Sequence, residues 1–342
     1  MAASADTASI AECNARHRAP PPDDVAGHES RRWARWARYA AGMTDRSPPA
    51  RLTRFAQRNH ARLAYEPVAA PVGAPAVVML HDLLDDRSRF AALRHALAAS
   101  GTPLRLVLPE MRGHGASAAL VDRRFALGDL TADLLAVLDA EAIARAHLVG
   151  FGLGGTVGLE TARLAPARIA SLVLYEPMCG SSLANDPRPA RRAVGAATDA
   201  QLRAVADASY KDLADRALDL LLEPRLGAAW REEMPRPRLA AIRRHAGALA
   251  PLLNALAVAR LTSEQLRTIA VPTLIVQTAN AQEVDRVVAA WLAEELAAAR
   301  LLTLGGVANI TSPLNDEATP ALARAIRAFL GEVEGIAGEP SG

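Results

Sequence analysis

Short apolar runs alternate with amphipathic segments over much of the chain. The runs predict buried strands at residues 76–80, 104–108, 147–150, 170–175, 272–276 and 299–304. The segments between them repeat apolar residues at helical spacing and predict helices at 87–99, 128–140, 154–164 and 317–330. Strands that alternate with helices in this way are typical of a parallel sheet covered on both faces. The pattern therefore predicts an α/β fold with a mostly parallel, doubly wound sheet.

The alternation stops between residues 180 and 268. This stretch is rich in Ala, Leu and Arg, is punctuated by prolines, and predicts helices with no strand among them. A helical block between two strands of one sheet is expected to lie over the carboxyl edge of the strands, where open α/β sheets bind ligands. The sequence predicts a core at 63–179 and 269–332, with a helical lid at 180–268 and a flexible end at 333–342.

The N-terminal segments differ in composition from the core. Residues 1–28 mix small, charged and proline residues and predict a disordered tail. Residues 29–62 are expected to form a basic amphipathic helical extension, in which Trp33, Trp36 and Tyr39 recur at helical spacing among arginines. We favour docking of this aromatic stripe on the main domain. Membrane contact through residues 29–43 is the alternative.

Composition narrows the class of protein. The formal net charge of the 342 residues is +2, which gives no indication of a nucleic-acid partner. Two cysteines provide neither a disulfide framework nor metal-ligand spacing. No run of 18 apolar residues and no signal-peptide pattern is present, so a cytoplasmic protein is expected. Gly150–Gly155 superficially resembles a dinucleotide loop but follows a late strand. No cofactor and no metal are expected.

Four local motifs occur in one order along the predicted core. They are His81-Asp82 after a strand, Arg112-Gly113-His114-Gly115-Ala116-Ser117, Val149-Gly150-Phe151-Gly152-Leu153-Gly154-Gly155 between a strand and a helix, and Leu304-Gly305-Gly306-Val307-Ala308-Asn309. Together they resemble the α/β-hydrolase superfamily, in its lidded, esterase-like and lactonase-like branch. The resemblance covers about residues 63–332 and implies an α/β-hydrolase fold with an inserted helical lid. It also implies a catalytic Ser–His–acid triad at three matching positions.

The chain departs from this triad at all three positions. Gly152 stands where the resemblance places the nucleophilic serine, and it has no side chain to form an acyl-enzyme. Asn309 stands at the position of the base, where a carboxamide takes up no proton near neutral pH. Ala281 stands at the usual position of the acid. The sequence therefore predicts a degenerate triad at Gly152, Ala281 and Asn309, and ordinary serine-hydrolase activity is expected to be absent.

A ligand pocket is nevertheless predicted at the turn. The N–H groups near Leu153 begin a helix and attract negative charge, and His81, Asp82, Phe151 and Gly152 are expected around them. Asp82 replaces a glycine of the usual oxyanion loop, so this part of the pocket is expected to be altered. We expect His81 to brace its loop. A role as general base is the alternative.

Two further side chains follow the strand at 170–175. Glu176 matches an acid position that some superfamily members use, and we favour a structural or ligand-contact role for it over a role as general base. Cys179 is a candidate for a relocated nucleophile, but no histidine is paired with it by motif.

Two main hypotheses of function follow. The first is a non-hydrolytic binder or pseudoenzyme for a small apolar or carboxylate- or ester-like ligand. The second is a hydrolase, lyase or isomerase of non-standard mechanism that uses His81 or Glu176 as general base. A scaffold role of the N-terminal helix is a third and weaker hypothesis.

Overall fold

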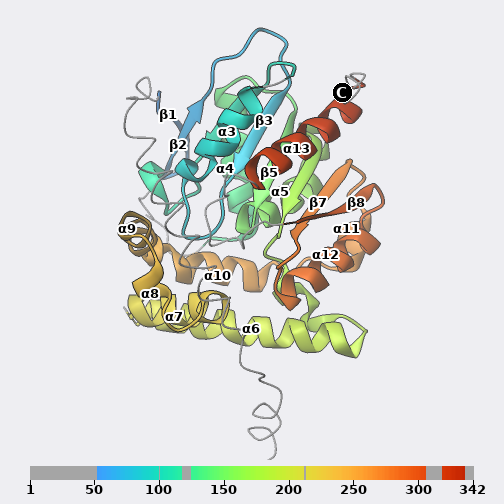
Figure 1. Cartoon of the computed structure of the whole chain (residues 1–342). Helices are drawn as coiled ribbons and strands as arrows, with labels where there is room; N and C mark the ends of the chain where they lie inside the picture. The colour runs from blue at the N-terminus through green and yellow to red at the C-terminus, as the bar shows by residue number, and fades with distance from the viewer. Residues whose placement is uncertain (1–51, 100, 118–124, 212, 306–317, 336–342) are drawn as a thin grey trace, which may run out of the picture. The chain divides into compact units, whose positions relative to one another are not determined.

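A computed structural model describes residues 52–99, 101–117, 125–211, 213–305 and 318–335. Within them, eight strands form one sheet (Figure 1). In the order in which they lie side by side, the strands are β1 (Arg54–Arg58), β2 (Ala61–Pro67), β4 (Arg105–Pro109), β3 (Ala76–Leu80), β5 (Ala146–Phe151), β6 (Ile169–Tyr175), β7 (Thr273–Thr278) and β8 (Ala299–Leu304). All pairs from β4 to β8 are parallel, whereas β2 is antiparallel to both β1 and β4. The predicted α/β fold with a mostly parallel sheet is confirmed.

The N-terminal hairpin corrects one prediction. Residues 54–62, expected in a helical extension, form β1 and the start of β2, which are joined across a turn in which Asn59 adopts a φ of 50°. Asparagine tolerates this left-handed conformation better than most residues. The strand was hard to predict because only Ala56 of β1 is fully buried, so the alternation of apolar and polar residues is weak. The predictions for residues 1–51, including the membrane contact, lie outside the described residues.

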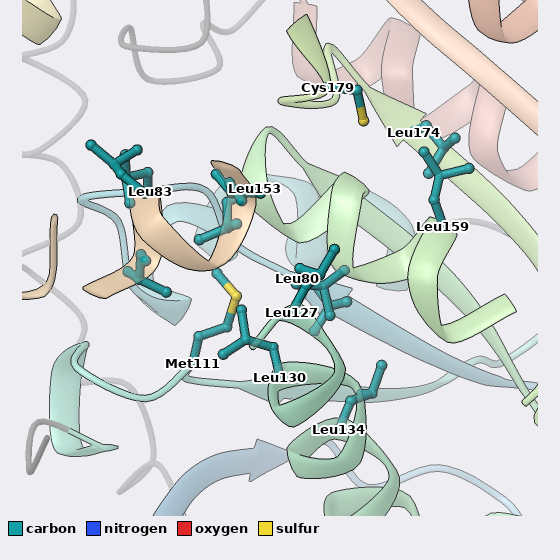
Figure 2. Packing of buried hydrophobic residues seen from close by; sticks show 14 of the residues in the cluster. Leu80, Leu83, Met111, Leu127, Leu130, Leu134, Leu153, Leu159, Leu174 and Cys179 are labelled. Atoms are coloured by element: carbon teal, nitrogen blue, oxygen red, sulfur yellow. The ribbon is translucent and has the colours of Figure 1, made fainter. Parts of the chain in front are cut away.

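Helices cover both faces of the sheet because alternate residues of each strand point to opposite sides. Val77 and Met79 pack with α3 (Ala91–Ala98) and α13 (Ala318–Glu334) in one core. Val78 and Leu80 face the other core, which is formed with α4 (Leu127–Ala140), α5 (Leu153–Leu164) and α12 (Glu283–Glu295). Figure 2 shows part of this second core, with Leu80, Leu127, Leu130 and Leu159 labelled. Helix α13 runs two residues past the predicted end of the core at residue 332.

The stretch between β6 and β7 contains helices and no strand among its described residues. Its elements are η4 (Gly180–Asn185), α6 (Pro189–Tyr210), α7 (Ala214–Leu226), α8 (Trp230–Glu233), α9 (Arg236–His245), η5 (Ala246–Ala248), α10 (Leu249–Val258) and α11 (Ser263–Arg267). Helices α6 to α10 gather beyond one end of the strands (Figure 1). We call residues 180–268 the helical insertion. Its apolar residues, among them Leu221, Leu252 and Trp230, join the core that contains α4 and α5.

Candidate functional site

The register of three neighbouring strands brings distant residues to one edge of the sheet. Leu80 of β3 lies opposite Gly150 of β5, and Phe151 of β5 lies opposite Tyr175 of β6. The residues that follow these strands therefore emerge side by side at their carboxyl ends. The edge between β3 and β5 is also where the order of strands reverses, because β4 lies on one side of β3 and β5 on the other. Ligands of α/β sheets bind at such a position.

Gly152 forms the sharp turn between β5 and α5. Its φ of 49° and ψ of −112° lie in a region that glycine adopts without steric cost, whereas a residue with a side chain is strained there. The Gly152 N–H donates to Tyr175 O at 3.0 Å, and the N–H of Met178 donates to Gly152 O at 3.0 Å. The turn is therefore fixed against β6 even though no side chain projects from it.

The carboxylate of Asp82 occupies the space beside Gly152. A Cβ added to Gly152 would lie closer than 3.0 Å to Cγ and both carboxylate oxygens of Asp82. Asp82 Oδ1 also accepts the Leu153 N–H at 2.7 Å. This N–H belongs to the first residue of α5, where unpaired N–H groups and the helix dipole stabilise negative charge. An aspartate from the loop after β3 thus fills both the space of a side chain at position 152 and the anion site beside it.

Burial disfavours the charged form of Asp82. Desolvation and the nearby Asp85 raise the pKa of Asp82 to about 6, against the opposing effects of the Leu153 N–H and Arg89. Asp85 itself pairs with Arg238 of α9 and lies 3.5 Å from Arg89. Asp82 is consequently a carboxyl group that changes its charge in the pH range in which proteins commonly operate.

Glu176 follows β6 directly and has an unusual backbone. It adopts a φ of 44°, which is uncommon for a residue with a side chain. Its Oε1 accepts the N–H of Thr278 at 3.0 Å and the Thr278 hydroxyl at 2.7 Å. Its Oε2 is buried and has no hydrogen-bond partner. Burial and the neighbouring Asp285 raise the pKa of Glu176 to about 7.

A small cavity joins these groups to the helical insertion. Its volume is about 50 Å³, which is room for roughly four water-sized groups. The apolar residues of its wall are Leu83, Leu84, Met178, Leu221, Leu222 and Ile242. The charged residues of its wall are Asp82, Asp85, Glu176, Arg225, Arg238 and Asp285, and Gly152 completes the lining. Sequence analysis singled out Asp82, Gly152 and Glu176 among these residues.

His81 lies beside this cavity without lining it. Its Nδ1 is 2.8 Å from Asp82 O, and its Nε2 accepts the N–H of Met111 at 3.0 Å. Burial lowers the pKa of His81, which favours the neutral ring that this pair of bonds requires. These two bonds hold the His81 ring between its own loop and the residues that follow β4. Action as general base would require one of these bonds to break.

Three histidines connect the loops under the insertion. The His114 ring lies 4.9 Å from that of His81 and 5.0 Å from that of His245, measured between ring centroids. His245 accepts the Gly115 N–H at 3.2 Å and lies 3.3 Å from Leu84 O. The end of α9 is therefore attached to the loop that lines the cavity. Among the described residues, no group of His, Cys, Asp and Glu side chains is arranged to hold a metal ion.

The remaining predicted residues have other surroundings. Phe151 stacks on Tyr175, with centroids 4.6 Å apart, in the core on the α3 and α13 face, and Leu153 places its side chain in the opposite core. Ala281 is buried after β7 and offers no carboxylate. Cys179 is buried, and desolvation raises the pKa of its thiol to about 12, which opposes its use as a nucleophile. Asn309 lies outside the described residues.

Sequence reasoning missed four charged residues of the cavity wall. Asp85 and Asp285 follow the carboxyl ends of β3 and β7 by a few residues. This position in the sequence could have marked them as candidates for the site. Arg225 and Arg238 come from α7 and α9 of the insertion, and no motif marks them.

Known proteins resemble this chain in sequence over about a third of its length and in structure over most of it. A protein of Variovorax paradoxus named "Putative carbamate hydrolase RutD" is 40% identical over 112 residues, which are 33% of this chain. The match spans only 41% of that relative's length. A protein of the same name from Caulobacter vibrioides is 33% identical over 112 residues, 33% of this chain and 41% of that protein.

Solved structures match over most of the described fold. A hydrolase from Pseudomonas aeruginosa is 25% identical with a TM-score of 0.63, covering 83% of this chain and 100% of that one. The enol-lactonase from Burkholderia xenovorans is 24% identical with a TM-score of 0.60, covering 81% and 99%. The model of the alpha/beta hydrolase family matches residues 77–325. Together with the sheet order and the turn at Gly152, this match shows that the chain belongs to the alpha/beta hydrolase family.

Proposed function

We propose that this protein binds a small ligand in the cavity at Gly152 and does not hydrolyse substrates by the serine mechanism of its family. One observation carries the proposal: the Asp82 carboxylate fills the space of the side chain at position 152 and accepts the Leu153 N–H. The names of the relatives, which include hydrolases and a lactonase, indicate the ancestry of the fold. Fold alone does not determine activity.

The first support is the missing nucleophile. Covalent hydrolysis at this turn needs an oxygen or sulfur atom on residue 152, and glycine provides neither. Cys179 does not replace it, because its buried thiol has a raised pKa and its Sγ contacts the Thr156 hydroxyl at 3.5 Å.

The second support is the occupied anion site. In serine hydrolases the N–H after the nucleophile stabilises the oxyanion of the tetrahedral intermediate. Here the Leu153 N–H is already bonded to Asp82 Oδ1 at 2.7 Å. An oxyanion would have to displace a buried carboxylate from this donor and then lie beside it. The charge repulsion opposes the stabilisation that the donor would provide.

The third support is that a cavity is present at Gly152 although the groups for serine-dependent hydrolysis are not available there. The insertion closes it with Leu221 and Leu222 of α7 and Ile242 of α9, and the sheet edge contributes Gly152 and Glu176. The wall combines six apolar residues with six charged ones, so it offers both apolar contact and polar partners to a small ligand. Binding is therefore the activity that the remaining groups can support.

Purified protein should hydrolyse p-nitrophenyl acetate and small lactones at the rate of the buffer alone. Triad enzymes stripped of their catalytic side chains still keep about 10³–10⁴-fold acceleration from the oxyanion hole and binding. Since Asp82 occupies that N–H here, we expect less than this residual acceleration. Release of p-nitrophenol from the ester and release of acid from the lactones, both measured against heat-inactivated protein, check the expectation.

An Asp82→Gly variant serves as the matched comparison in this assay. Opening the Leu153 N–H should raise any background hydrolysis, whereas wild-type protein should show none. Saturable wild-type turnover that is abolished by a serine-reactive phosphonate would refute the proposal.

A second candidate function rests on Glu176. Glu176 lines the cavity, its Oε2 has no hydrogen-bond partner, and its pKa near 7 is suited to accepting a proton at neutral pH. In this function Glu176 activates a water or abstracts a substrate proton, and no covalent intermediate forms. Turnover of any screened substrate that disappears in Glu176→Gln but survives the phosphonate would favour this function over pure binding.

A further inference from the structure

The charged wall of the cavity is unequally balanced. Of its four carboxyl groups, Asp85 is neutralised by Arg238 and lies near Arg89. The other three carboxyl groups are those of Asp82, Glu176 and Asp285. The positive charge of Arg225, also on the wall, lowers the pKa of Glu176 and of Asp285. The unpaired part of the wall therefore carries more acceptors than donors.

Two of these acceptors lack any partner. Glu176 Oε2 and Asp285 Oδ2 are buried without a hydrogen bond, although the two residues are only 2% and 9% exposed. Both residues line the cavity, and the charge of Asp285 raises the pKa of Glu176. A buried acceptor without a donor is costly, and such exceptions in a folded protein call for an explanation. A ligand that brings N–H donors would supply the missing partners.

The rest of the wall limits what the donors can be attached to. Leu83, Leu84, Met178, Leu221, Leu222 and Ile242 present apolar surface. A volume of about 50 Å³ has room for roughly four heavy atoms. A short alkyl chain with one charged head fits both the size and the two kinds of surface.

We propose that the cavity binds a small primary amine in its ammonium form, with the ammonium group between Glu176 and Asp285 and the alkyl group against the leucines. This inference rests on the proposed binding function and names its ligand class. An ammonium group has three N–H donors and a positive charge, and hydrogen bonds between charged groups are the stronger ones. The expectation of a carboxylate-like ligand is not favoured, because such a ligand would lie among three carboxyl groups.

The test is a titration of the full-length protein with methylammonium and ethylammonium chloride at pH 8 and constant ionic strength. Potassium chloride, ethanol and potassium acetate are titrated in parallel. The amide resonance of Thr278, whose N–H donates to Glu176, reports the binding by NMR. The two non-hydrogen atoms of methylammonium and the three of ethylammonium set lower bounds for Kd of about 6 mM and about 0.5 mM, so saturation is expected in the millimolar range or above it.

We expect both ammonium ions to bind and acetate, ethanol and potassium chloride not to bind. Glu176→Gln should weaken ammonium binding by about 10- to 100-fold, since it replaces a charge-assisted bond by a neutral one. Glu283→Gln makes the same change on an exposed residue of α12 and should alter Kd by less than about twofold. In wild-type protein the binding should strengthen between pH 6 and pH 8 as Glu176, with its pKa near 7, ionises.

Saturation by acetate or ethanol with no response to either ammonium ion would overturn the inference and leave ligand binding at this site standing. Ammonium binding of unchanged strength in Glu176→Gln would also overturn it. No saturable response to any titrant would overturn it as well. The wild-type pH series decides independently if the variant fails to fold, because weaker ammonium binding at pH 8 than at pH 6 would contradict it. Serine-dependent ester hydrolysis in the same samples would instead refute the proposed function.

Discussion

Replacing Gly152 by alanine should lower the free energy of unfolding by about 3 kcal/mol or more, from overpacking, backbone strain at positive φ and a disrupted charged hydrogen bond. The new Cβ would overlap the Asp82 carboxylate and force it away from the Leu153 N–H. Chemical denaturation followed by circular dichroism measures this change. Serine at the same position should be at least as unfavourable, so simply restoring a nucleophile should not restore a hydrolase.

Two variants control this prediction. Gly158→Ala makes the same change inside α5, the helix that Gly152 precedes, where the nearest atoms to the new Cβ lie at 3.6 Å or beyond. It should be neutral or stabilising, because alanine favours helix by about 1 kcal/mol over glycine. The double variant Asp82→Gly, Gly152→Ala should recover at least about 2 kcal/mol relative to additivity, since the clash is gone. Additive losses would mean that Asp82 does not occupy the space at Gly152.

Glu176→Gln should stabilise the protein at pH 8 by about 1–3 kcal/mol. The ordinary pKa of 4.5 and the value of about 7 in the folded protein differ by an amount equivalent to about 3 kcal/mol. Because the folded state holds this proton more tightly than the unfolded chain, wild-type stability should fall as pH rises from about 4.5 to about 7. Glutamine has no such titration, and its amide oxygen can still accept from Thr278.

Urea denaturation at several pH values between about 4.5 and 8 measures this difference. The variant should show a flatter dependence of stability on pH than the wild type across that range. Glu283→Gln, on an exposed part of α12, should retain the wild-type slope. A less stable Glu176→Gln at pH 8, or an unchanged slope, would show that Glu176 is not the buried acid described above. Residues that are retained for binding often lower the stability of a protein. Stabilisation by Glu176→Gln would therefore agree with a binding role for Glu176.

The sequence predicted most of the sheet because its central strands are buried on both faces. The run 76–80 coincides with β3 and the run 170–175 with all but the first residue of β6, and the order of motifs identified the fold. The hairpin of β1 and β2 was not predicted because its outer strand buries a single residue, Ala56, and its apolar and polar residues alternate only weakly. Edge strands of this kind have too little apolar surface to mark themselves in the sequence.

The sequence predicted which turns and loops form the site, but only some of the side chains that line it. The glycine at the turn after β5 and the aspartate in the loop after β3 could both be predicted from motifs. The sequence does not reveal that the Asp82 carboxylate occupies the space beside Gly152. The two residues are 70 positions apart and are brought together only by the register of β3 and β5. Arg225 and Arg238 come from helices whose packing over the sheet edge depends on the whole insertion.

The most direct test of this account is the pH titration of the Leu153 amide by NMR on isotope-labelled protein. If Asp82 accepts this N–H, the Leu153 amide resonance should shift with a midpoint near pH 6, the pKa of Asp82 in the folded protein. In Asp82→Asn, which keeps an acceptor oxygen but cannot ionise, this titration should vanish. A Leu153 amide that does not titrate in the wild type, or that titrates equally in Asp82→Asn, would contradict the claim that this carboxylate occupies the catalytic position of the fold.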